Sequence, residues 1–226
     1  MYFCTMEDWI LRTQIHQDWI GLFFFINFLL ISALFILDSE RLQTLFRPFS
    51  LPVYLGKYNS EKNLNYLNNF NVLSFLVIVN TLALLFYWAL QFNSLSIAYA
   101  YEFYYFLISL YTLVLVRFIL VRFLSKELKL IKRTRSSFFK LFSINTKFSF
   151  YLIIFLFFYE FSSFNKEVIN VLIFCLVIGW SIVYTGVLIN YFRNHPKDIF
   201  YLFLYLCMFK VAPWLWYFRI FIETKL

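Results

Sequence analysis

Six stretches of about 20 mostly apolar residues follow one another along the chain, and they constrain its fold more than any other feature. A helix of that length crosses a bilayer, because each residue advances about 1.5 Å along the axis. Backbone groups in lipid must hydrogen bond within their own segment, so each stretch is predicted to be a helix. The stretches are residues 19–37, 70–92, 99–121, 148–164, 168–192 and 199–221.

The composition supports the same class of protein. Apolar residues make up 62 % of the chain and charged residues 14 %, whereas a soluble domain has about 45–50 % and about 25 %. We therefore expect an all-α fold, a polytopic transmembrane helical bundle of six spans that forms one domain over residues 1–226. The net charge of +8 then concerns membrane orientation, and no nucleic-acid partner is expected.

Two connectors between the predicted spans are long. Residues 38–69 contain Pro48 and Pro52 among short apolar runs, which argues against a further span. We expect this segment to form an elbow at the membrane interface, followed by a solvated loop. Residues 122–147 hold eight Lys and Arg side chains and are predicted to be a basic cytoplasmic loop.

Positive charge is distributed unevenly between the two sides that six spans define. The connectors after the first, third and fifth spans carry fourteen Lys and Arg residues, and the opposite side carries four. Cytoplasmic loops are enriched in Lys and Arg. The asymmetry therefore predicts that these three connectors are cytoplasmic and that both termini lie outside.

Ionisable and amide side chains inside the spans are the first functional candidates, because they are costly in hydrocarbon. Lys210 lies about half way along the last span and Glu160 lies in the outer half of the fourth. If these spans are neighbours, the two side chains can meet, either as part of a proton or ion relay or as a buried ion pair that only fixes helix register. The intramembrane candidates are Lys210, Glu160, Glu102, Arg117 and Asn80.

Pro213 follows Lys210 by three residues. A proline in a helix removes one backbone hydrogen bond and kinks the helix. The freed carbonyl groups can accept a hydrogen bond from a nearby ammonium, so this kink offers Lys210 a partner on its own helix.

The basic connector has two interpretations. Its cations either contact anionic headgroups at the cytoplasmic face, where each contributes about 1 kcal/mol, or dock an acidic partner protein. The residues concerned are Lys126, Lys129, Lys132, Arg133, Arg135 and Lys140. In the fifth span, Gly179 and Gly186 lie seven residues apart on one face, which predicts an internal seam where two helices approach closely.

Several functional classes find no support in the sequence. The chain has neither a zinc-protease nor a phosphate-binding loop motif, and the cysteines Cys4, Cys175 and Cys207 have no metal-ligand spacing. The predicted topology places His16 and His195 on opposite sides of the membrane, which argues against a haem held by both. We therefore expect no enzymatic activity, no cofactor and no metal site.

Three segments carry a resemblance to a known family. They are "HQDWIGLFFF" before and within the first span, "NFNVLSFLVIVN" in the second, and "FLYLCMFKVAPWLWYF" in the last. Together they resemble a family of integral membrane proteins of Bacteroidota that is known as a domain of unknown function. The resemblance covers nearly the whole chain and implies an inner-membrane location. It also implies an acid at the position of Lys210, so the lysine departs from the family pattern.

These observations favour a non-enzymatic, multi-pass protein of the bacterial inner membrane with both termini periplasmic. Its expected role is that of a structural or accessory subunit of a cell-envelope complex, in contact with other membrane proteins and with lipid. The alternative function is a small transporter or lipid-handling protein that uses Lys210 and Glu160. The alternative location is the mitochondrial inner membrane, since the chain has the Phe and Tyr bias of an AT-rich genome.

Overall fold

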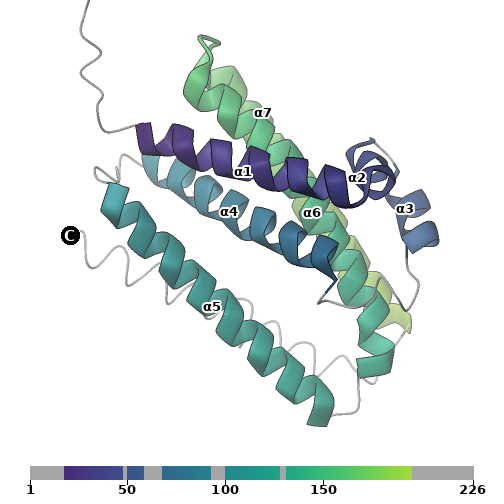
Figure 1. Cartoon of the computed structure of the whole chain (residues 1–226). Coiled ribbons are helices and arrows are strands. Elements are labelled where there is room, and N and C mark those ends of the chain that lie inside the picture. Colours follow the sequence, from purple (N-terminus) through teal and green to yellow (C-terminus); the bar gives the residue numbers. More distant parts are fainter. Residues whose placement is uncertain (1–17, 48–49, 59–67, 93–99, 128–130, 195–226) are drawn as a thin grey trace, which may run out of the picture.

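The computed structural model describes residues 18–47, 50–58, 68–92, 100–127 and 131–194 (Figure 1). These ranges form helices joined by short turns, and they contain no strand. The all-α prediction is therefore confirmed for this part of the chain. The helices are α1 Asp18–Leu37, α2 Ser39–Phe46, α3 Leu51–Tyr58, α4 Asn69–Phe92, α5 Ala100–Glu127, α6 Ile131–Phe161 and α7 Lys166–Asn194.

Four of these helices are long and apolar enough to cross a membrane, whereas the sequence predicts six spans. Helix α5 covers the predicted third span, but its apolar section, Phe103–Val116, is shorter than a span. The predicted sixth span, 199–221, lies outside the described residues. The four candidate spans are Trp19–Leu37, Asn69–Ala89, Phe139–Phe161 and Lys166–Asn190.

The connector predicted over residues 122–147 is largely helical where the structure describes it. Helix α5 continues to Glu127 and α6 begins at Ile131, so the helix of the predicted fourth span starts well before residue 148. Phe139 and Ile144 are buried while Lys140 is half-buried. The buried Leu141, Ile144 and Phe148 repeat at helical spacing, so this part of the predicted loop packs inward as a helix.

The long helices run in alternating directions, so their ends gather in two groups. The Trp19 ring lies 5.4 Å from the Tyr87 ring and 4.5 Å from the Phe103 ring, between centroids. The Phe24 and Phe161 rings are 5.8 Å apart. The beginnings of α1 and α5 thus meet the ends of α4 and α6 at one end of the molecule (Figure 1), which we call the Trp19 end.

The opposite end is built around the short helices α2 and α3, and we call it the Arg41 end. The predicted elbow is helical there, with Leu42 and Tyr54 buried against Phe70 of α4 and Phe139 of α6. Helix α2 is capped at its start by Asp38, whose Oδ1 accepts a hydrogen bond from the Arg41 amide at 3.0 Å.

Two side chains of α6 hold the carboxyl end of α2. The Tyr151 hydroxyl donates to the Phe46 carbonyl at 2.6 Å, and the Lys147 ammonium donates to the Arg47 carbonyl at 2.7 Å. The last carbonyl groups of a helix lack partners within it and carry partial negative charge. A hydroxyl and a cation are therefore suitable donors, and they join residues about 100 positions apart in the sequence.

Helix α7 is the exception to this close packing. It lies mainly against α6, and 6 % of its Lys166–Asn190 window is buried, compared with 56 % of the Asn69–Ala89 window. A Cβ atom added at Gly179 or Gly186 would meet no atom within 4 Å. Among the described residues none packs on these glycines, because α6 lies on another side of α7, and the internal seam stays a prediction.

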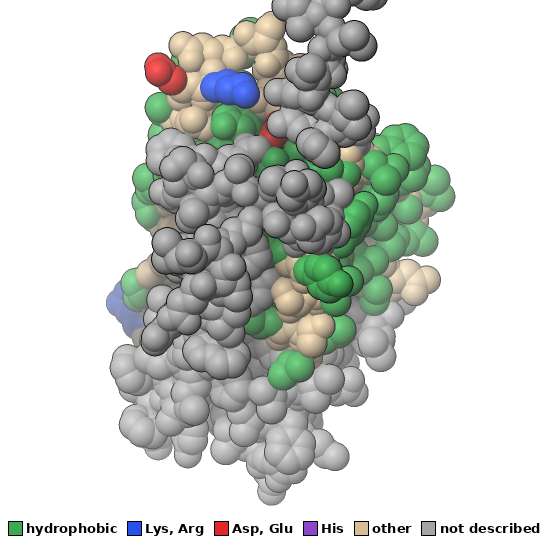
Figure 2. All heavy atoms as spheres, turned by 90° about the vertical axis from the view of Figure 1, so that its left-hand side faces the viewer, with side chains coloured by type: hydrophobic (Ala, Val, Ile, Leu, Met, Phe, Trp, Pro, Cys, Tyr) green, Lys and Arg blue, Asp and Glu red, His purple; other side chains and the backbone are tan. Residues whose placement is uncertain are grey.

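The outer surface of the described helices is strongly apolar. Side chains such as Ile36, Tyr105, Ile182 and Phe164 are between 67 % and 83 % exposed. On the face shown in Figure 2, hydrophobic side chains make up most of the described surface, and few charged groups are in view. Such a surface is compatible with a membrane protein.

We predict that Tyr54→Phe lowers the free energy of unfolding by about 1.5–3 kcal/mol, since the buried Arg41 guanidinium then loses an acceptor. That guanidinium donates from Nε to the Tyr54 hydroxyl at 2.9 Å. Tyr58→Phe is the matched control, because it keeps the ring whose centroid lies 5.6 Å from Arg41 Cζ. The measurement is the melting temperature of the detergent-solubilised protein, and equal stability of both variants contradicts the assigned role of the hydroxyl.

Candidate functional site

A small cavity lies between α1, α4 and α6 at the Trp19 end. Its volume is about 10 Å³, which is enough for one group of the size of a water molecule. Apart from one carboxylate, aliphatic and aromatic side chains line it. The lining residues are Ile20, Phe24, Leu84, Tyr87, Trp88, Leu156, Tyr159 and Glu160.

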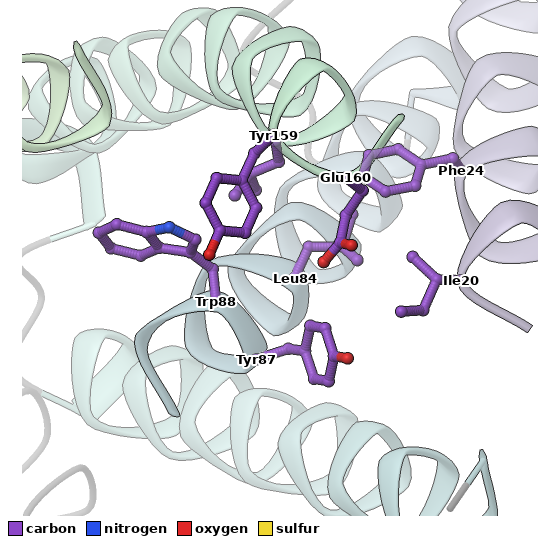
Figure 3. Close-up of a pocket in the computed structure, with 8 residues that line it drawn as sticks. Ile20, Phe24, Leu84, Tyr87, Trp88, Tyr159 and Glu160 are labelled. Carbon is purple, nitrogen blue, oxygen red and sulfur yellow. The ribbon is translucent and has the colours of Figure 1, made fainter. Parts of the chain in front are cut away.

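Glu160 supplies the charge of this cavity. It stands one residue before the end of α6, and Figure 3 shows its carboxylate directed into the space beside Leu84 and Ile20. The side chain is half-buried. Within the described part of the chain, the carboxylate accepts no hydrogen bond.

Lys166 is the positively charged group that acts on this carboxylate. It is the first residue of α7, on the far side of a short turn from Glu160, and its ammonium lies 5.4 Å from the centroid of the Tyr159 ring. The one ion pair among the described residues joins Lys57 to Glu40. Glu160 and Lys166 therefore present opposite charges at the same end without being in direct contact.

The structure describes only some of the intramembrane residues that the sequence selects. Lys210 and Pro213 lie outside the described residues, and so does Lys129. Pairing of Lys210 with Glu160 therefore stays a prediction. Six further candidates lie in helices whose side chains at these positions are not described, namely Glu102, Arg117 and Lys126 in α5 and Lys132, Arg133 and Arg135 in α6.

Asn80 has a clear structural partner. It is 5 % exposed, and its Oδ1 accepts a hydrogen bond from the Tyr111 hydroxyl at 2.6 Å, which joins α4 to α5. Two similar contacts reach α7: Trp88 donates to Asn170 at 2.9 Å, and Trp180 donates to Asn145 at 3.0 Å. Each asparagine thus links two helices through an aromatic donor, a common form of helix contact in membranes.

The most deeply buried charge among the described residues was not one of the predicted site residues. Arg41 was counted as one cation of a connector, but it is 1 % exposed. Its Nη2 donates to Asn71 Oδ1 at 2.8 Å, and its Cζ lies 4.0 Å from the centroid of the Phe70 ring. Its position in α2 was the available signal, because Arg41 shares a helix face with the buried Leu42 and Leu45.

Tyr54 completes the surroundings of Arg41 as a neutral group. Burial raises the pKa of the Tyr54 phenol above its ordinary value, and the adjacent Arg41 guanidinium opposes part of that rise. The phenol therefore stays protonated near neutral pH and accepts from the guanidinium without cancelling its charge. Among the described residues no carboxylate pairs with Arg41, so hydrogen bonds and aromatic rings are what compensate for its burial.

A family model described as "Domain of unknown function (DUF4271)" matches residues 20–221, so the chain belongs to this family. The match confirms the expectation that a domain of unknown function covers nearly the whole chain. No curated protein and no solved structure matches the chain.

We predict that Asn80→Leu and Tyr111→Phe are coupled in stability. Each single variant breaks the same hydrogen bond, so the double variant loses little more than either one, with a coupling energy of about 0.6 and at most about 1.7 kcal/mol. Thr112→Val is the control, since Thr112 bonds only the Ile108 carbonyl of its own helix. Additive losses in detergent unfolding experiments contradict a role for Asn80 as a helix contact.

Proposed function

We propose that this member of the DUF4271 family is a non-enzymatic, multi-pass membrane protein that serves as a structural or accessory subunit of a cell-envelope complex. The observation that carries the proposal is the open face of α7. Its residues include Gly179 and Gly186 together with exposed Ile178, Ile182 and Val183. This face has the composition of a surface on which a helix of another membrane protein packs.

The physical argument concerns what a glycine does on a lipid-facing helix. Lipid tails are as apolar as leucine, so helices in a bilayer associate through close packing and interhelical hydrogen bonds. A glycine lets another backbone approach closely, but on an unpartnered surface it contributes no contact and costs about 1 kcal/mol of helix propensity. Gly179 and Gly186 on one open face therefore favour a partner helix.

The distribution of described cations supports an orientation in the membrane. Lys166 lies at the Trp19 end, whereas the Arg41 end and the adjoining end of α7 hold Arg41, Arg47, Lys57, Lys140, Lys147 and Arg193. By the positive-inside rule the Arg41 end faces the cytoplasm, with α2 and α3 as its interfacial elbow and both chain termini outside. The proposed membrane is the bacterial inner membrane of Bacteroidota, with the mitochondrial inner membrane as the alternative.

The basic segment from Lys126 to Lys140 keeps its two proposed roles under this orientation. It lies at the cytoplasmic end of α5 and α6, where its cations contact anionic headgroups or dock an acidic partner. The alternative function, a small transporter or lipid-handling protein, is favoured by one observation, the carboxylate of Glu160 in its cavity.

We predict that Gly179→Leu together with Gly186→Leu releases partner subunits from the protein purified in mild detergent. The two leucines occupy the space that a partner backbone needs, and no atom of the described residues lies within 4 Å of either glycine Cβ position, so they meet no obstacle in that part of the chain. Ile182→Leu, on the same exposed surface, is the control. If the same proteins co-purify with all variants, α7 is not the docking surface.

We predict that a single cysteine at position 163 is labelled from outside intact cells and one at position 136 is not. Ser163 lies in the turn between α6 and α7 at the Trp19 end, and Ser136 lies near the start of α6. The single cysteines are introduced as Ser163→Cys and Ser136→Cys in a chain whose Cys4, Cys175 and Cys207 are replaced by serine. The reverse labelling pattern overturns the proposed orientation.

A further inference from the structure

We draw no further inference here: the strongest candidate, the exposed apolar face of α7 around Ile178 and Ile182, belongs to the partner surface already proposed, and no contact among the described residues shows what covers it.

Discussion

Hydrogen bonding of polar groups in apolar surroundings is the constraint on which the rest of this structure depends. In the proposed bilayer no water reaches the hydrocarbon region, so each amide or hydroxyl within a span needs a partner in the protein. Hydroxyl groups find one on their own helix, as Thr81 does at the Val77 carbonyl, 2.7 Å away. Asn80, Asn145 and Asn170 instead accept hydrogen bonds from aromatic donors on other helices, as Asn80 does from Tyr111.

The same constraint explains why Arg41 and the short helices belong together. A buried guanidinium has five donors and is costly without partners, and no single helix can supply the acceptors. Helix α3 provides Tyr54 and helix α4 provides Asn71. Helices α2 and α3 therefore fold back onto α4 and α6. The contacts of Arg41 hold these short helices in place, and the short helices in turn bury Arg41.

The sequence predicts most of the fold because bilayer thickness sets the length of an apolar run. Helices α1, α4 and α7 follow the predicted bounds closely for this reason. The beginning of α6 was missed because a run of cations resembles a loop, although Leu141, Ile144 and Phe148 pack inward at helical spacing. Arg41 was missed because its partners Tyr54 and Asn71 lie 13 and 30 residues away, and no local sequence pattern indicates contacts between residues so far apart.

The cavity could be predicted only in part, for a related reason. Glu160 is visible in the sequence as an acid within an apolar stretch, but its depth depends on where α6 ends, and that was placed at residue 164 rather than Phe161. The shift brings Glu160 close to the end of its helix. Part of the cavity wall comes from residues more than 60 positions away in the sequence, such as Tyr87, and it is apparent only once α4 lies against α6.

The turn between α6 and α7 determines how these two helices follow one another. Asn165 caps α7 by accepting a hydrogen bond from the Glu167 amide at 2.9 Å, and Ser162 bonds the Phe158 carbonyl at the end of α6. These contacts fix where one helix stops and the other starts. They place Glu160 and Lys166 on either side of one short turn, and they set the direction in which α7 turns Gly179 and Gly186 away from α6. The proposed docking face itself begins more than ten residues further along α7, so substitutions on that face leave the contacts of the turn in place.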